Sequence, residues 1–92
     1  MKYPKGIKAV YDNGGKTADR YTIIFKGLYN EDLYSSNVYD AVAANDTPTH
    51  PAYGFYQHCS AQLGNHNGRK ISWLSLPKSV RSLVNEEREY YG

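Results

Sequence analysis

The sequence predicts an α+β fold, in which an antiparallel meander of three to four strands packs against a C-terminal helix. Two runs of alternating apolar and polar residues flank an Asn-Gly pair within residues 6–26, which is typical of an antiparallel hairpin. A third β-forming run follows at residues 33–42, and apolar residues recur at helical spacing after Pro77. A chain of 92 residues has room for one core, so residues 1–92 are expected to form a single domain.

The N-terminal hairpin has the clearest pattern. In its first strand the residues that share one face are Ile7, Ala9 and Tyr11. In its second strand they are Tyr21, Ile23 and Phe25. Asn13-Gly14 supplies the two positive-φ positions of a tight hairpin turn between them.

The middle of the chain is less regular. Residues 30–32 predict a second turn, before the third strand at residues 33–42. Residues 43–53 contain Pro48 and Pro51, each of which favours extended geometry in the residue before it, so an ordered loop is expected. We expect a short helix or irregular segment at residues 53–63, a loop at 64–68 and a short strand at 69–74.

The C-terminus predicts a helix with Pro77 at its first position. The apolar residues that fall on one face of this helix are Leu76, Val80, Leu83, Val84 and Tyr91. An isolated helix of this length is marginal in water, so the stripe must pack on another surface. The expected partners are Trp73 and the Tyr21/Ile23/Phe25 face.

Composition excludes several classes of protein. The net charge of +2 is too small for sequence-independent binding to long nucleic acid. The longest apolar run, residues 21–25, is far shorter than a membrane span, and residues 1–4 lead into a strand without the apolar stretch of a signal peptide. Cys59 is the single cysteine and forms no internal disulfide, which favours a cytoplasmic protein. Ten tyrosines favour half-buried surfaces, so a homo-oligomer is expected.

Basic residues near the predicted helix suggest a phosphate site. Lys78 and Arg81 occupy its first turns, where free N–H groups attract anions. Arg69 and Lys70 come only a short strand earlier. Residues 64–70 do not match a phosphate-binding loop, because three residues rather than four separate the glycines and no Ser or Thr follows the lysine.

The histidines do not suggest a metal site. His50, His58 and His66 are eight residues apart, which matches no standard ligand spacing, so no metal and no cofactor are expected. A Cys59 nucleophile with a histidine base stays open, because such partners need only meet in space. A buried cysteine without catalytic function is the more common case.

One short segment is suited to recognising a nucleobase. Phe55, Tyr56 and His58 could stack on a base, and Gln57 or Asn65 could read its polar edges. Core packing is the alternative role for each of these aromatic residues. Lys16 and Arg20, which follow the hairpin turn, are second-rank candidates for ligand contact.

Residues 11–22, Tyr-Asp-Asn-Gly-Gly-Lys-Thr-Ala-Asp-Arg-Tyr-Thr, resemble the opening motif of a family of small phage and prophage proteins, most of them hypothetical. The later blocks that are similar are residues 45–51, Gly54-Phe55, Gln57-His58, Leu63-Gly64, residues 68–71 and Leu76-Pro77. The resemblance covers roughly residues 7–84. Tyr56 and Cys59 stand where smaller residues are expected, which affects the shape of any pocket that they border.

A phage setting implies an inhibitor of bacterial immunity, because small phage proteins include oligomers that sequester nucleotide signals. The leading hypothesis is a homo-oligomer that binds a cyclic ADP-ribose isomer or a cyclic oligonucleotide and blocks a system such as Thoeris. Arg69, Lys70 and Arg81 would hold the phosphates. The alternatives are a small phosphodiesterase that uses His58 or His66, and a protein-binding inhibitor of a host enzyme of the anti-CRISPR type.

Overall fold

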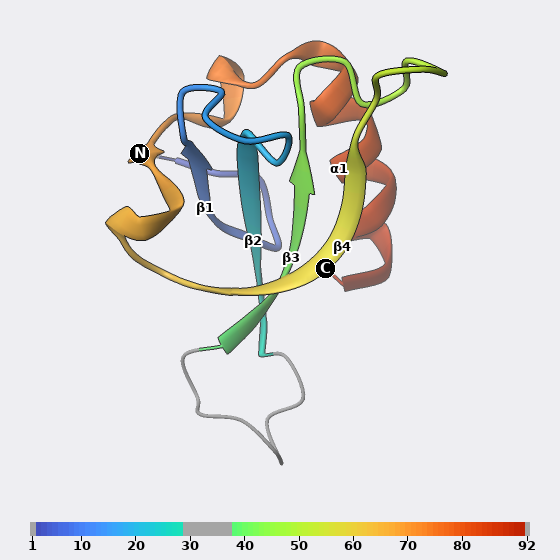
Figure 1. The fold of residues 1–92 in the computed structure, drawn as a ribbon. Coiled ribbons are helices and arrows are strands. Elements are labelled where there is room, and N and C mark those ends of the chain that lie inside the picture. Colours follow the sequence, from blue (N-terminus) through green and yellow to red (C-terminus); the bar gives the residue numbers. More distant parts are fainter. Residues whose placement is uncertain (1, 29–37, 92) are drawn as a thin grey trace.

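The computed structural model describes residues 2–28 and 38–91, which form a five-stranded antiparallel sheet and one α-helix (Figure 1). The elements are β1 (Ile7–Asp12), β2 (Tyr21–Leu28), β3 (Val38–Ala44), β4 (Tyr56–Gln62), β5 (Arg69–Lys70) and α1 (Lys78–Tyr91). The predicted α+β class is confirmed, and the sheet has slightly more strands than expected.

The strand order is β4-β3-β2-β1-β5. β1 to β4 form a meander, and the chain then crosses to the opposite edge, where β5 pairs with β1. Figure 1 shows this connection sweeping from β4 across the sheet to the side of β1, through a 3₁₀ turn at Asn65–Asn67. β4 and β5 are therefore the two outermost strands.

The main core lies between the sheet and α1. Its buried residues are Ile7, Val10, Tyr21, Ile23, Phe25, Val42, Ala44, Ile71, Leu76, Val80 and Val84. Tyr3, Tyr56 and Trp73 pack against this cluster. The predicted docking of the helix on Trp73 and on the Tyr21/Ile23/Phe25 face is confirmed, whereas the side chain of Tyr91 lies outside the described part.

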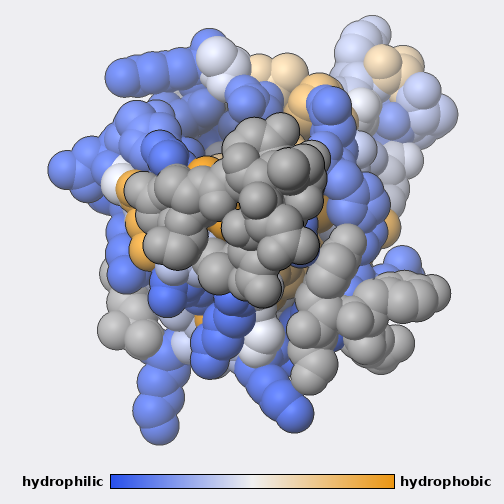
Figure 2. Space-filling model, turned by 90° about the horizontal axis from the view of Figure 1, so that it is seen from below, coloured by the Kyte–Doolittle hydropathy of each residue, from blue (hydrophilic) through white to orange (hydrophobic). Residues whose placement is uncertain are grey.

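A second, smaller cluster lies on the other face of the sheet. It consists of Ala9, Tyr11, Ile24 and Ala41, and its partly buried neighbours include Tyr39 and Cys59. The connection between β4 and β5 reaches this face, because the Gly64 amide donates to the Tyr11 hydroxyl at 3.2 Å. Both faces of the central strands are therefore buried. On the surface, hydrophilic residues dominate the end of the molecule that Figure 2 shows.

The hairpin of β1 and β2 is confirmed, but its turn is wider than predicted. The predicted common face of Ile7, Ala9 and Tyr11 is wrong, because a register shift between Ile7 and Ala9 leaves Ile7 in the main core and Ala9 and Tyr11 in the cluster on the other face. An eight-residue loop, residues 13–20, separates the strands, and the positive-φ positions are Gly14 (81°) and Gly15 (84°). Asn13 is held differently, because its side chain bonds the amides of Gly15 and Lys16. The local amide bonds of an Asx-type loop therefore replace the two-residue turn.

Three further predictions need correction. Where a short helix or irregular segment was predicted at residues 53–63, Tyr56–Gln62 form strand β4, because they pair with β3 at seven positions. The third strand begins at Val38 in the described part and continues to Ala44; residues 30–32 and 33–37 lie outside the described residues. β5 is only two residues long, because a 3₁₀ turn at Trp73–Ser75 follows it.

The C-terminal helix begins one residue later than predicted. Pro77 caps α1 rather than opening it, since its carbonyl accepts the first helical hydrogen bond from the Arg81 amide at 3.0 Å. This difference lies within the usual uncertainty of a helix end. Leu76, Val80 and Val84 are almost fully buried, as the stripe predicted.

Candidate functional site

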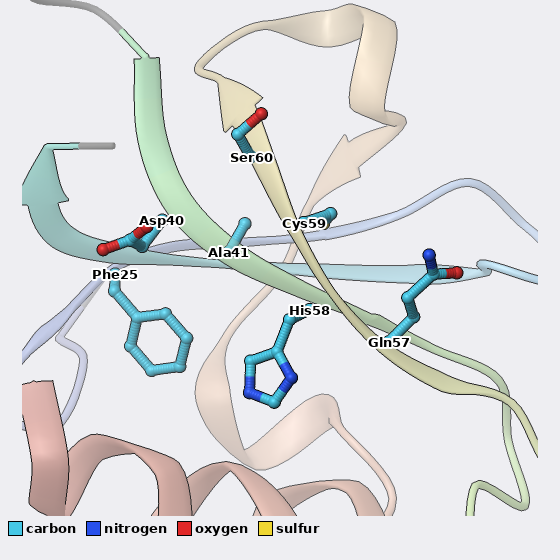
Figure 3. Close-up of a pocket in the computed structure, with 7 residues that line it drawn as sticks. All are labelled: Phe25, Asp40, Ala41, Gln57, His58, Cys59 and Ser60. Carbon is cyan, nitrogen blue, oxygen red and sulfur yellow. The ribbon is translucent and has the colours of Figure 1, made fainter. Parts of the chain in front are cut away.

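A pocket of about 580 Å³ lies along β3 and β4, with Phe25 of β2 among its lining residues (Figure 3). Its lining residues are Phe25, Asp40, Ala41, Gln57, His58, Cys59 and Ser60. Figure 3 shows the rings of Phe25 and His58 pointing toward the helix. This volume falls in the range of small-molecule sites.

One lining residue, His58, contacts the helix beside the pocket. His58 Nε2 on β4 lies 2.8 Å from Glu87 Oε2 on α1. The Glu87 side chain is 20% exposed and the His58 side chain 60%, so the imidazole is oriented by a shielded carboxylate while it remains open to solvent. Tyr56 packs edge-on against His58, with 6.2 Å between the ring centroids. These contacts fix the position of the imidazole before any ligand binds.

Asp40 and Ser60 add polar groups next to His58. They are paired opposite each other in the β3–β4 ladder, and the next pair on the same face is Val42 and His58. Strand alternation therefore places Asp40, His58 and Ser60 on the helix side. Together they offer a carboxylate, a hydroxyl and an imidazole beside the Phe25 ring. No lysine or arginine is among the described residues that line this pocket.

Cys59 is a weak candidate for a nucleophile. Its side chain is half-buried, and burial raises the pKa of the thiol above its ordinary value. The negative charge of Asp19 raises it further. The thiol therefore stays protonated at neutral pH, whereas a cysteine nucleophile requires a lowered pKa.

The basic residues expected to bind phosphate lie on the other side of the molecule. Arg69 and Lys70 form β5, four strand spacings of about 4.8 Å along the sheet from β4. Arg81 donates through Nε to the Leu76 carbonyl at 3.2 Å. Arg88, seven residues further along the same side of α1, reaches the Lys5 carbonyl near β1. Arg69 and Lys70 therefore lie at the opposite edge of the sheet from the His58 pocket, and Arg81 bonds the chain just before α1.

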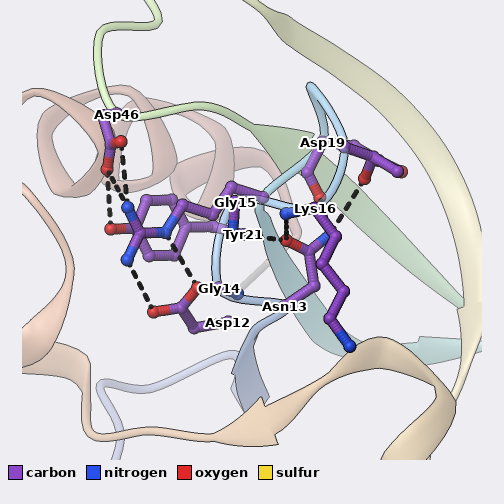
Figure 4. Close-up of polar contacts among 10 residues, drawn as sticks. Asp12, Asn13, Gly14, Gly15, Lys16, Asp19, Tyr21 and Asp46 are labelled. Carbon is purple, nitrogen blue, oxygen red and sulfur yellow. Dashed lines mark hydrogen bonds and ion pairs between the residues drawn. The ribbon is translucent and has the colours of Figure 1, made fainter.

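The glycine-rich loop at residues 13–20 uses its own amides (Figure 4). Asp12 Oδ1 accepts from the Gly14 amide at 2.7 Å. Asn13 Oδ1 accepts from Gly15 and Lys16 at 2.9 and 3.1 Å. Lys16 carries an exposed side chain at this loop, but the three amides that could surround an anion already bond side-chain oxygens.

Arg20 holds two connections together through its guanidinium (Figure 4). Its Nε and Nη2 donate to the two carboxylate oxygens of Asp12, at 2.9 and 3.2 Å. Its Nη1 donates to Asp46, in the loop after β3, at 3.0 and 3.2 Å. The hydrogen bonds from Arg20 lower the pKa of Asp12 below its ordinary value. All three guanidinium nitrogens thus bond carboxylates of the chain itself.

Tyr21 completes this group of contacts. Its hydroxyl donates to Asp46 Oδ1 at 2.8 Å, and the Arg20 guanidinium lies 5.1 Å from the centre of its ring. Burial, together with the hydrogen bond to Asp46, raises the pKa of Tyr21 to about 12. Much of the motif at residues 11–22 therefore makes contacts that hold the hairpin and the following loop together.

Phe55 lies at the end of an ordered loop, as the prolines predicted. Asn45 Oδ1 accepts from the amides of Thr47 and Phe55, both at 3.1 Å, and its Nδ2 donates to the Tyr53 carbonyl. Gly54 is required there, because a Cβ would lie 2.6 Å from the Pro48 carbonyl oxygen. Phe55 is thereby fixed next to β4, outside the pocket lining.

Asn65 and His66 lie in the 3₁₀ turn between β4 and β5. Both are exposed, and the Asn65 carbonyl accepts from the Gly68 amide at 3.0 Å. Of the predicted ligand-binding residues, Gln57 and His58 thus line the pocket, with Tyr56 against His58. Phe55, Asn65, Lys16, Arg20, Arg69, Lys70 and Arg81 lie elsewhere.

Sequence reasoning missed Phe25, Asp40 and Ser60 as residues that line the pocket, and Glu87 as the partner of His58. Glu87 had a usable signal, because it follows Val80 and Val84 at helical spacing on the stripe that faces the sheet. Asp40 and Ser60 had none, since their pairing depends on recognising β4 as a strand.

Within residues 2–28 and 38–91, no cluster of His, Cys, Asp and Glu side chains has the arrangement of a metal site. α1, the helix of this part of the chain, lacks the length and apolar character needed to cross a bilayer. The fold and the site together define a small α+β protein with a pocket of small-molecule size beside an outer strand. Comparison with family models, curated proteins and solved structures finds no match to this chain.

Proposed function

We propose that this protein binds a nucleotide-derived small molecule without transforming it, and that the base or nucleoside part lies in the His58 pocket. The observation that carries this proposal is the oriented imidazole of His58, held 2.8 Å from Glu87 at the mouth of a 580 Å³ pocket. The exposed imidazole of His58 offers a face or an edge to a planar base, while Phe25 is buried in the core beneath it.

The polar lining suits a base or a sugar better than a phosphate. Asp40 accepts hydrogen bonds from an exocyclic amine or a ribose hydroxyl, and the Ser60 hydroxyl can donate or accept beside it. The Gln57 side chain points away from His58, so its amide is not part of this polar group (Figure 3). A phosphate inside the pocket would face the negative charges of Asp40 and Glu87. The phosphates of the ligand would therefore point out of the pocket. Because Arg69, Lys70 and Arg81 of the same copy lie away from the pocket, these cations could contact the phosphates only from another copy.

The biological setting of this proposal comes from the resemblance to small phage proteins. There the protein would act in the cytoplasm of the infected bacterium as a homo-oligomer that sequesters a cyclic ADP-ribose isomer or a cyclic oligonucleotide. Sequestration would remove the signal of a defence system such as Thoeris. The acid-lined pocket supports a ligand with donor groups on its base or sugar, as adenine nucleotides have.

Thermal melting against adenosine, ADP-ribose, cyclic ADP-ribose isomers and cyclic dinucleotides tests this proposal. A ligand at 100 times its dissociation constant stabilises the folded state by about 2.7 kcal/mol, which for this size of chain is a shift of several degrees. We expect His58→Ala to abolish the shift. The matched control is His66→Ala, an exposed histidine outside the pocket, which should retain it.

Further variants locate the phosphates. Loss of binding in Arg69→Ala or Arg81→Ala would support their predicted role, whereas unchanged affinity in both would limit the site to the pocket. The absence of a shift with every compound, or an equal loss in the His58 and His66 variants, would overturn the proposal.

A phosphodiesterase is the second candidate, because a carboxylate-oriented imidazole is also the arrangement of a general base. The two functions differ in what happens to the ligand. Incubation followed by heat release should return it intact from a binding protein and cleaved from an enzyme. In the second case His58→Ala should abolish cleavage. A protein-binding inhibitor would instead retain one host protein in a pull-down and show no small-molecule effect.

A further inference from the structure

The two outer strands of the sheet are protected in different ways. β5 is two residues long and both residues are basic, which is how many proteins prevent pairing with another sheet. β4 is seven residues long and contains neither proline nor Asp, Glu, Lys or Arg. Two of its residues, Cys59 and Ala61, also carry short side chains. β4 therefore lacks the usual features that keep an edge strand unpaired.

The hydrogen bonds show which groups of β4 point outward. The Asn45 amide donates to the Phe55 carbonyl at 3.1 Å, one position beyond the end of the β3–β4 ladder. Because bonded and non-bonded pairs alternate in an antiparallel ladder, Gln57, Cys59 and Ala61 bond β3. The amides and carbonyls of His58 and Ser60 then point away from the sheet. The Gln62 carbonyl has the same parity, and it accepts from Asn67 Nδ2 at 2.7 Å.

We propose that β4 pairs antiparallel with β4 of a second copy of this chain, around a two-fold axis at Cys59. In this register the hydrogen bonds between the copies come from His58 and Ser60, because the Gln62 carbonyl already accepts from Asn67 of its own chain. The pairs are Tyr56 with Gln62, Gln57 with Ala61, His58 with Ser60, and Cys59 with Cys59 of the second copy. His58 and Ser60 form a bonded pair with the outward groups identified above. The two sheets become one continuous sheet with both helices on the same face.

A second copy fits this edge better than an unrelated strand because β4 is complementary to itself. Two of its bulkier side chains, Gln57 and His58, fall opposite the small Ala61 and Ser60. The pairing also completes the pocket, since Ser60 of the second copy lies directly opposite His58, next to the pocket mouth. The interface does not require the ligand, so it can be tested, and can fail, independently of the proposed function.

Cysteine cross-linking tests the register. In this arrangement the two Cys59 residues form a non-bonded pair, whose Cα atoms lie about 4.5 Å apart, within disulfide range. Mild oxidation of the unmodified protein should give a covalent dimer. In a Cys59→Ser background, Gln57→Cys or Ala61→Cys should not, because each new cysteine is about 13 Å from its copy. Cross-linking strongest at position 57 or 61, or absent at all three, would overturn this register.

Sedimentation equilibrium tests the interface without cysteine chemistry. Ser60→Pro removes an outward amide in each copy and leaves the β3 ladder intact, as proline is tolerated at such edge positions. We expect it to weaken dimerisation at least about tenfold while circular dichroism stays unchanged. Cys59→Lys, which places two charges across the axis, should do the same. A monomeric unmodified protein at high concentration, or dimers unaffected by both changes, would refute the proposal.

Discussion

At the scale of single residues, Arg20 and Gly68 show how the ends of the strands are fixed. Arg20 bridges Asp12 at the end of β1 and Asp46 after β3, and Asp46 is 26 residues from Arg20 in sequence. Gly68 lies where the returning chain passes the end of β1. The contacts of Arg20 and Gly68 hold the backbone in place and do not fill the core. This role explains why the motif at residues 11–22 is rich in polar residues.

The ion pair of Asp12 predicts acid sensitivity. Because the pKa of Asp12 is lowered in the folded state, its contribution to stability is complete above the ordinary aspartate range and is lost as the pH falls through the folded value. Asp12→Asn should lower the melting temperature by about 4–8 °C at pH 7. The difference in melting temperature between this variant and the unmodified protein should become smaller below about pH 4. If melting curves show the same difference in melting temperature at every pH, the charge of Asp12 does not contribute to stability as described.

Gly68 predicts a steric effect that Gly14 lacks. Both have positive φ, 109° and 81°, so Gly→Ala strains the backbone by about 1–2 kcal/mol at either position. A Cβ at Gly68 would lie 2.6 Å from Asn13 Cα, whereas at Gly14 nothing lies within 4 Å. Gly68→Ala should therefore reduce the free energy of unfolding in urea by about 1–3 kcal/mol more than Gly14→Ala. Equal losses would show that the chain relaxes around Gly68.

At the scale of elements, α1 connects the core to the pocket. Val80 and Val84 are fully buried against the sheet, and Glu87, one turn further along, bonds His58. The helix therefore positions the pocket only as firmly as its apolar stripe holds it on the sheet. The burial of Leu76, Val80 and Val84 was predictable from the stripe, and the helical spacing placed Glu87 on the same side; its contact with His58 depends on the position of β4.

Shortening a buried apolar side chain of α1 should lower the free energy of unfolding, whereas changing an exposed polar side chain of the same helix should not. Val84→Ala removes the equivalent of two methylene groups and leaves a cavity, so we expect a loss of about 1.5–3 kcal/mol in urea unfolding. Ser82→Ala, on the exposed side of the same helix, serves as the control and should change stability by less than about 0.5 kcal/mol. Similar losses in both variants would argue against the docking of α1 by this face.

At the scale of the whole molecule, the sheet has one closed edge and one open edge. β5 ends the sheet at two basic residues, while β4 presents the outward groups of His58 and Ser60. The pocket opens on the same side as the open edge. Ligand binding and self-association would therefore involve neighbouring surfaces, and mutations in β4 are expected to affect both.

Hydrogen exchange should detect this edge directly. In dilute protein the amides of Gln57, Cys59 and Ala61 should be protected by β3, while those of His58 and Ser60 exchange quickly. Raising the protein concentration should slow exchange at His58 and Ser60, because dimerisation satisfies these amides. The amides within β2, which is central in the sheet, provide the reference. Fast exchange at both positions at every concentration would exclude pairing through β4.

The sequence by itself determined the elements whose signals are local. The alternating pattern around Asn13 and Gly14 gave the hairpin, and the 3.6-residue period after Pro77 gave the helix and its buried face. These elements are set by side-chain periodicity, which neighbouring residues carry. The α+β class followed from them. The length of the loop at residues 13–20 could not be predicted in this way, because the side-chain hydrogen bonds of Asp12 and Asn13 compete with those of a tight turn.

Only the tertiary structure decided the nature of β4 and the site. Tyr56–Gln62 has weak local preference and becomes a strand because β3 offers it unpaired hydrogen-bonding groups. That pairing brings Ser60 opposite Asp40 and turns His58 toward Glu87, which is 29 positions away in sequence. The same topology moves Arg69 and Lys70 to the far edge. Contacts between distant segments depend on strand order, and no local pattern in this chain encodes it.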